Sequence, residues 1–159
     1  MTPERYFFIY AFPCAYLKLE RGDLTKKEYE LLEKKFLNKD SPDRRELERV
    51  FSPAFVWIKR ISERLNKDIW DFNVIYEYWN KEHNEIINNG EGKYSEYPEV
   101  LKDLCRIHEA EIVRKQEDKN ILLVKYNRKQ RAVFSHLVPN AKIGDKVKIH
   151  YAYAVEEVE

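Results

Sequence analysis

Residues 137–150 read LVPNAKIGDKVKIH, and this stretch decides the fold of the C-terminal part of the chain. Proline cannot donate to a strand ladder, so Pro139 ends a strand, and Gly144-Asp145 is typical of a tight turn. Beyond the turn, Val147 and Ile149 alternate with charged residues, which is the period-two pattern of a strand with one buried face. The stretch therefore predicts a strand end, a turn and a second strand packed on an apolar core.

The same period-two pattern extends over the neighbouring residues. We expect strands near residues 106–115, 120–126, 130–137 and 146–154. Glu117-Asp118 and Asn127-Arg128-Lys129 are plausible hairpin turns between them. Four or five short antiparallel strands in so few residues favour a small OB-like β-barrel, because closure removes exposed edges.

The first half of the chain carries helix signals instead. Thr2-Pro3 is a cap followed by a proline in the first turn, and Gly22 suits a helix end. Pro13 lies between them and should kink this helix, because it removes one backbone donor. Thr25 and Glu28 form a capping box for a second helix.

Further helix starts follow along the same half. Ser41-Pro42 and Ser52-Pro53 repeat the cap-then-proline signal. Apolar residues recur at three- and four-residue spacing from Ile69 to Ile86, which predicts a longer amphipathic helix ending at Asn88-Asn89-Gly90. A short helical turn from Pro98 to about residue 104 closes this part of the chain.

Length and charge agree with this division. The chain has 159 residues, 43% of them hydrophobic and 36% charged, with a formal net charge of +1. The length allows one domain of ordinary size or two small ones. Residues 1–104 hold a net charge of −2 and residues 105–159 one of +3. We therefore predict an α+β protein, with a helical domain at 1–104 and a small antiparallel OB-like barrel domain at 105–159.

The longest apolar stretch and the two cysteines indicate the cellular location. The longest apolar stretch, residues 6–17, has 12 residues, whereas a membrane span needs about 20, so we expect a buried helix and no membrane partner. Cys14 and Cys105 do not make a disulfide framework, which favours a reducing, cytoplasmic location.

The stretch quoted first resembles the signature L-V-P-x-A-x-x-G-D-x-V-x-V-H of the HypC/HupF family of nickel–iron hydrogenase assembly chaperones. Ala154-Val155-Glu156 continues this resemblance, and Cys105 precedes Ile112-Val113 by the spacing of the family's own cysteine and strand. The resemblance implies an accessory protein that docks on protein partners during metal-centre assembly. A HypD-like protein and a hydrogenase large subunit would be those partners.

The same resemblance suggests two site residues. Cys105 would transiently hold an iron unit, which makes it the candidate metal ligand, since soft sulfur suits such iron. His150 would lie at the partner surface. Plainer interpretations are that Cys105 is a small buried residue at a domain junction and that His150 is a barrel histidine bonded to a backbone carbonyl. Cys105 is internal here, unlike the family's near-terminal cysteine, and the proline that follows it in the family is absent.

For three other side chains the sequence predicts a structural role and no chemistry. We expect Cys14 to be plain core packing within its aromatic helix. His83 lies on the apolar side of its helix, which favours a half-buried role over metal ligation. His136 precedes Leu137 in a predicted strand and should point to solvent.

A different function class rests on basic residues around the two hairpins. They are Arg114, Lys115, Lys125, Arg128, Lys129 and Arg131. With Tyr126 nearby, they resemble the charged and aromatic surface on which OB-like barrels bind single-stranded nucleic acid. A solvated strand face gives the same pattern, and an interaction module unrelated to metals is a third possibility. No nucleophile elbow or phosphate-binding loop is present, so we do not expect an enzyme.

Overall fold

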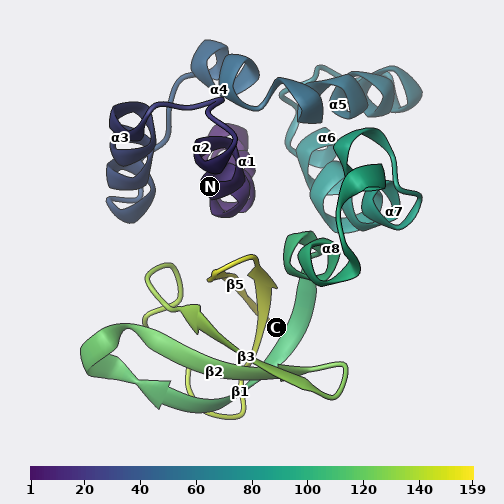
Figure 1. Cartoon of the computed structure of the whole chain (residues 1–159). Helices are drawn as coiled ribbons and strands as arrows, with labels where there is room; N and C mark the ends of the chain where they lie inside the picture. Colours follow the sequence, from purple (N-terminus) through teal and green to yellow (C-terminus); the bar gives the residue numbers. More distant parts are fainter. The chain divides into compact units, whose positions relative to one another are not determined.

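The computed structural model describes residues 1–159 and divides them into two compact units, Met1–Asn89 and Gly90–Glu159. The first unit is helical and the second contains a closed β-barrel, so the predicted α+β organisation is confirmed (Figure 1). A 3-10 helix at Gly92–Glu96 and the helix α8 (Glu99–Cys105) both fall within the second unit, so the division comes earlier in the chain than the boundary expected at Cys105. None of the helices combines the length and apolar character that crossing a membrane requires.

The first predicted helix is interrupted where proline occurs. Helix α1 (Pro3–Ala11) leads into a 3-10 turn at Phe12–Cys14 and then into α2 (Ala15–Glu20). The Thr2 side chain caps α1 by accepting a hydrogen bond from the Arg5 amide at 3.2 Å. The sequence predicts a kink at Pro13, and the turn around this residue is a 3-10 turn and no longer α-helical.

The next helices show how local capping sets their starts. The capping box before α3 (Lys26–Leu37) is complete, with reciprocal Thr25 and Glu28 hydrogen bonds of 3.1 and 2.9 Å. Helix α4 (Arg44–Val50) starts later than Ser41-Pro42 predicts, because Asp43 provides the cap.

The second half of this unit contains α5 (Ser52–Leu65) and, after a loop, one continuous helical run. Helix α5 begins at the predicted Ser52-Pro53. After the Asp71 cap come α6 (Phe72–Glu77), a π-helical turn at Tyr78–Glu82 and α7 (His83–Asn88). The predicted amphipathic helix is therefore present, but it starts at Phe72 and contains a π turn.

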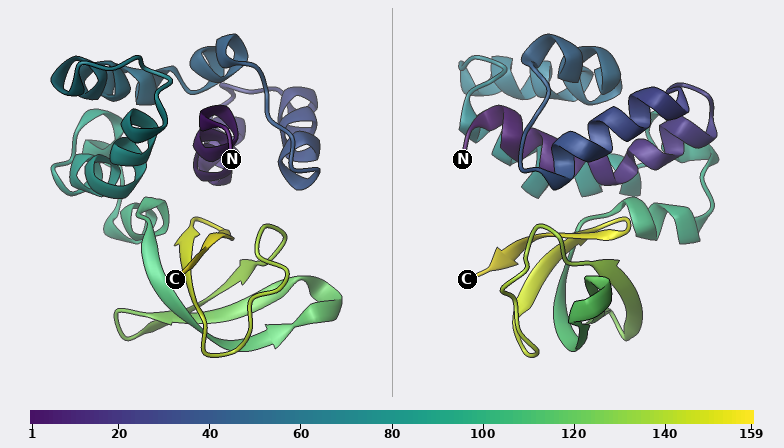
Figure 2. Two further views of the ribbon diagram at one scale, coloured as in Figure 1. Left: turned by 180° about the vertical axis from the view of Figure 1, so that it is seen from behind. Right: turned by 90° about the vertical axis from the view of Figure 1, so that its left-hand side faces the viewer.

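Aromatic packing on α1 forms the centre of the helical unit, and Figures 1 and 2 show α1 among the other helices of this unit. The Phe7 ring lies 5.0 Å from Phe55, 5.5 Å from Trp79 and 5.8 Å from Trp70, measured between ring centroids. Large aromatic side chains contribute much of the buried apolar area of a core, so Phe7 joins α1 to α5, to the loop before α6 and to the π turn after it.

Five strands make the barrel of the second unit. They are β1 (His108–Gln116), β2 (Ile121–Tyr126), β3 (Lys129–Phe134), β4 (Lys146–His150) and β5 (Tyr153–Val158). The barrel closes in the order β1-β2-β3-β5-β4. Neighbours are antiparallel except for β3 and β5, which pair in parallel through Phe134 and Tyr153. This one seam differs from the antiparallel prediction, because an odd number of strands cannot close with every neighbouring pair antiparallel.

Both predicted hairpin turns are confirmed. The chain passes from β1 to β2 through a 3-10 turn at Glu117–Lys119 and a left-handed Asn120. Asn127 and Arg128, between β2 and β3, have φ angles of 47° and 61°. Two consecutive positive φ angles define the type I′ turn that suits the twist of a two-residue hairpin.

Residues 137–150 complete the barrel. Val138 and Ala141 are buried in its apolar core together with Val147 and Ile149. At the turn, the Lys142 amide donates to the Asp145 carboxylate at 2.8 Å, and the Ile112 amide donates to the Asp145 carbonyl at 2.9 Å. Four apolar residues of this stretch therefore lie in the barrel core, and its Gly144-Asp145 turn is held by hydrogen bonds to Asp145.

Candidate binding site on the barrel unit

The two residues singled out by the family resemblance lie inside the second unit. Cys105 is the last residue of α8 and is 1% exposed, and His150 ends β4 at 0% exposure. No group of three or more histidine, cysteine, aspartate or glutamate side chains is arranged to hold a metal ion. The Cys105 thiol would have to be uncovered before it could reach an iron unit carried as cargo.

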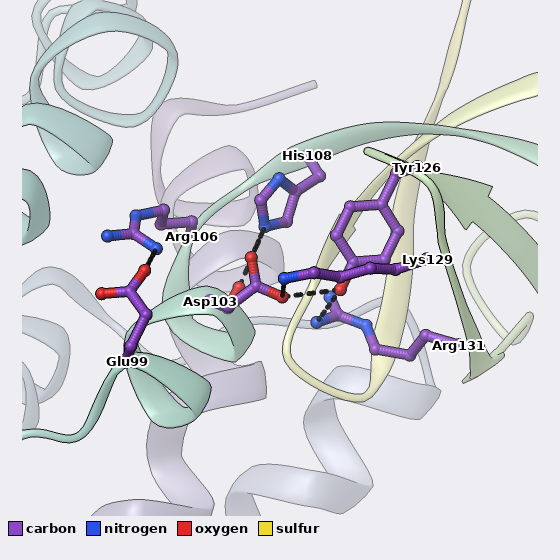
Figure 3. Close-up of polar contacts among 7 residues, drawn as sticks. All are labelled: Glu99, Asp103, Arg106, His108, Tyr126, Lys129 and Arg131. Atoms are coloured by element: carbon purple, nitrogen blue, oxygen red, sulfur yellow. Dashed lines mark hydrogen bonds and ion pairs between the residues drawn. The ribbon is translucent and has the colours of Figure 1, made fainter.

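Asp103, on the last turn of α8, is the centre of a group of polar contacts in the unit (Figure 3). The Tyr126 hydroxyl donates to Asp103 Oδ2 at 2.8 Å, and Lys129 Nζ lies 3.5 Å from the same oxygen. On its other side, His108 Nε2 lies 3.3 Å from Asp103 Oδ1 and 3.0 Å from the Asp103 backbone carbonyl. One carboxylate thus contacts side chains from three strands.

The Tyr126 ring makes further contacts beside this carboxylate. The Arg131 guanidinium lies over the Tyr126 ring, 5.1 Å from its centroid, and Arg131 Nη1 donates to the Tyr126 hydroxyl at 3.3 Å. The His108 ring lies 4.5 Å from the Tyr126 ring. We name Asp103, His108, Tyr126, Lys129 and Arg131 the Asp103 cluster.

The fold places these side chains by simple local rules. His108 opens β1, while Tyr126 ends β2 and faces Lys129 across the type I′ hairpin. Helix α8 is held beside them by the Tyr151 amide, which donates to the Leu104 carbonyl at 2.9 Å. An ion pair of 2.6 Å between Glu99 and Arg106 links the start of α8 to the residue after its end (Figure 3).

The protonation of the cluster follows from burial and charge. Burial raises the pKa of Asp103, but the Tyr126 hydrogen bond and nearby positive charges outweigh it and lower this pKa below its ordinary value. Burial lowers the pKa of His108 although Asp103 opposes this effect. Burial and the hydrogen bond to Asp103 raise the pKa of Tyr126. Near neutral pH the cluster therefore holds an ionised Asp103, a neutral His108 and a protonated Tyr126.

The Asp103 cluster pairs opposite charges within the barrel unit. The Asp103 carboxylate offsets Lys129, and Tyr126 engages Arg131, so two of the six basic residues proposed for nucleic acid make internal contacts. Lys115 does the same, because Lys115 Nζ donates to the Pro139 and Ala141 carbonyls at 2.9 Å each. The Asp103 cluster can hold α8 against the barrel, and no chemical step is needed to explain its geometry.

The remaining three basic residues are displayed outward. Arg114, Lys125 and Arg128 are exposed, and none of them takes part in a salt bridge or a side-chain hydrogen bond. Arg114 lies opposite Leu123 in the β1–β2 ladder, and Lys125 lies one outward position further along β2. The predicted basic group is therefore divided between internal contacts and the outer surface.

Three other predicted side chains have definite places. Cys14 is half-buried and His83 is buried. His136 does not simply point to solvent: it is half-buried, with its ring 5.6 Å from Phe134 and 6.4 Å from Tyr153. Strand β3 ends at Phe134, so strand alternation no longer sets the direction of the His136 side chain.

Asp103 itself was not identified from the sequence. The only local signal is that Glu99 and Asp103 are four residues apart and so share one face of a helix. Their partners come from β1, β2 and β3, and this proximity depends on the tertiary fold.

A comparison with models of known protein families matches none of them to this chain, and a comparison with curated proteins finds no match either. The resemblance to HypC/HupF proteins therefore rests on the residues quoted above. The small β-barrel predicted from the strand pattern is present in the second unit.

Proposed function

We propose that this chain is an accessory protein that acts by docking on a protein partner and catalyses no reaction itself. The observation that supports this most strongly is the inward placement of its chemically distinctive groups. Cys105 and His150 are buried, while the Asp103 cluster is occupied with internal contacts. What the barrel offers to other molecules is its surface, where exposed cations and partly exposed apolar side chains lie together.

The family resemblance suggests the setting of this docking. The partners would be a HypD-like protein and a hydrogenase large subunit, and the barrel would chaperone metal-centre assembly. An iron unit would then be cargo handed between proteins. Because Cys105 is 1% exposed, any contact of its thiol with that cargo requires the residues that cover it to move.

The test is an affinity capture of the full chain from its native cells, probed for a HypD-like protein and a hydrogenase large subunit. Recovery of either supports the proposal. A Cys105→Ala variant that retains these partners but loses maturation activity would support the cargo role. Recovery of RNA and of neither protein would contradict the proposal.

Nucleic-acid binding is the second candidate function, and one observation favours it. Arg114, Lys125 and Arg128 are exposed without ion-pair partners, as phosphate contacts require. This function predicts that binding of a labelled oligonucleotide weakens steeply as salt rises, and that Cys105→Ala has no effect on it. Salt-independent binding, or no binding at low salt, would exclude this function.

A further inference from the structure

One face of the barrel combines charge with apolar area. Its outward side chains come from β1, β2 and β3, and strand register places them in cross-strand rows. The first row is Arg114, Leu123 and Ala132, and the next is Gln116, Ile121 and Phe134. We call these two rows, together with Lys125 and Arg128, the outer β face.

The apolar part of the outer β face is accessible. Phe134 is 39% exposed, and Ile121 and Leu123 are each half-buried. Side chains directly opposite each other on neighbouring strands lie close enough to act as one surface. Leu123 and Phe134 therefore belong to a continuous apolar strip across β2 and β3.

The charge of the outer β face is positive. Arg114 lies in the first row, Lys125 lies one outward position beyond Leu123 on β2, and Arg128 lies in the β2–β3 turn. None of the three has an ion-pair partner. The carboxylate nearest in the strand register is Glu111, which lies opposite Lys125. At the nearby β1–β2 turn, Glu117 pairs with Lys115 at 3.4 Å, so its charge is already offset.

We propose that the outer β face binds an acidic segment of a protein partner. An apolar side chain of that segment packs on Leu123 and Phe134, and its carboxylates meet Arg114, Lys125 and Arg128. This inference rests on the proposed docking function and assigns it a surface and a partner chemistry. Apolar contact gives the complex its affinity, while complementary charge gives register and rate of encounter.

The composition of the face favours a protein over a nucleic acid. Base stacking uses a series of aromatic platforms, and Phe134 is the one aromatic side chain in the two rows. Tyr126, the aromatic residue expected to assist, is buried and donates to Asp103. Aliphatic side chains at the centre with arginine at the edge are typical of protein interfaces.

The test pans a random linear peptide library against the full chain, with a Leu123→Asp variant used for counter-selection. We expect the enriched peptides to carry an apolar residue flanked by aspartate or glutamate. Their affinity should fall about tenfold in Arg114→Glu, which corresponds to about 1.4 kcal/mol. Lys142→Glu is the matched control, because Lys142 is exposed but lies outside the three strands, and we expect less than about a twofold change there.

Four results would overturn this inference. Enriched peptides without acidic residues would contradict the partner chemistry, as would the absence of any enriched peptide. Equal binding of the enriched peptides by the wild-type chain and by Arg114→Glu would contradict the surface. Displacement of the peptides by a thymine oligonucleotide at equal or lower concentration would assign the face to nucleic acid.

The two proposals fail in different ways. If native partners are captured equally by the wild-type chain and by Leu123→Asp, docking stands and the outer β face is not its site. Circular dichroism melting of each variant distinguishes a lost surface from a lost fold. A variant that melts with the wild-type profile and still loses the peptides supports the inference.

Discussion

At the scale of single residues, the Asp103 carboxylate is the negative charge that lies beside Lys129 and His108 in the barrel unit. It accepts the Tyr126 hydroxyl hydrogen bond and lies within 3.5 Å of Lys129 Nζ and His108 Nε2. The Asp103 side chain is 16% exposed, so water screens these contacts less than it screens most surface pairs. Removing the carboxylate leaves the Tyr126 hydroxyl without this acceptor and Lys129 without its counter-charge.

This predicts a graded loss of stability at Asp103. Asp103→Ala should lower the free energy of unfolding by about 2 kcal/mol, because a charge-assisted hydrogen bond and a counter-charge are lost together. Asp103→Asn keeps an acceptor for Tyr126 and should lose about 1 kcal/mol. Urea unfolding measures both values. Asp118→Ala, at an exposed position in the β1–β2 turn, is the control, and an equal loss there would contradict the role of Asp103.

His108 should give the stability a pH dependence. Its folded pKa is lowered by burial, so between that pKa and the ordinary value of about 6.5 the unfolded chain binds more protons than the folded one. The stabilisation is complete above about pH 6.5 and is lost as the pH falls through the folded pKa. The charges around His108 are Asp103, which favours protonation, and Arg106 and Arg131, which oppose it.

The measurement is the free energy of unfolding of wild type and His108→Gln from pH 7.5 down to pH 5. The wild type should lose stability faster than the variant, with an extra slope of at most about 1.4 kcal/mol per pH unit from this one site. Parallel curves would show that His108 does not titrate in this way.

Residue identity predicted candidate groups here, but it did not predict their exposure. Cys105 and His150 fit the spacing of a family signature, and a signature does not distinguish a partner-facing side chain from one that fills the core. Both are buried in this fold. Asp103 had no signature at all, because its partners are separated from it in sequence by as many as 28 residues, as for Arg131.

At the scale of elements, local chemistry was sufficient to predict most starts and turns. The Thr25 capping box and both hairpin turns depend on residues within a few positions, and all are confirmed. The two wrong details of the helix predictions also have local causes. Asp43, and not Ser41, caps α4. The π turn at Tyr78–Glu82 lies within a stretch whose apolar spacing predicts a regular α-helix.

The β2–β3 turn carries the clearest prediction at this scale. Arg128 has a φ of 61°, a left-handed conformation that a side chain makes unfavourable by about 1 kcal/mol or more. Arg128→Gly should therefore be more stable than Arg128→Ala by about 1 kcal/mol, despite the greater unfolded-state freedom of glycine. Thermal melting compares the two variants.

The same pair of substitutions at Gln130 provides an internal control. Gln130 lies on β3 and has no positive φ, so glycine there should be less stable than alanine by about 0.5–1 kcal/mol. The order of stability is thus expected to reverse over two positions. The same order at both positions would mean that the turn conformation does not limit stability.

At the scale of the whole molecule, the sequence predicts two parts but not the place where they divide. The change from a period of 3.6 to a period of 2 falls at Cys105, and that change marks the first strand. The compact units divide at Asn89/Gly90 instead, because α8 makes its hydrogen bonds with barrel residues. Periodicity reports the type of each element, whereas unit membership depends on which side chains the element meets.

This difference predicts how fragments of the chain behave. Residues 90–159 contain the complete apolar core of the barrel and every member of the Asp103 cluster, so this fragment should fold with a cooperative thermal transition. Residues 105–159 lack Asp103 and the Leu104 carbonyl that accepts from Tyr151. That shorter fragment should be less stable by at least about 2 kcal/mol. Equal stability of the two fragments in urea would mean that α8 adds nothing to the barrel. Unfolding of 105–159 alone would show that a helix outside the β sequence pattern is needed to complete the β unit.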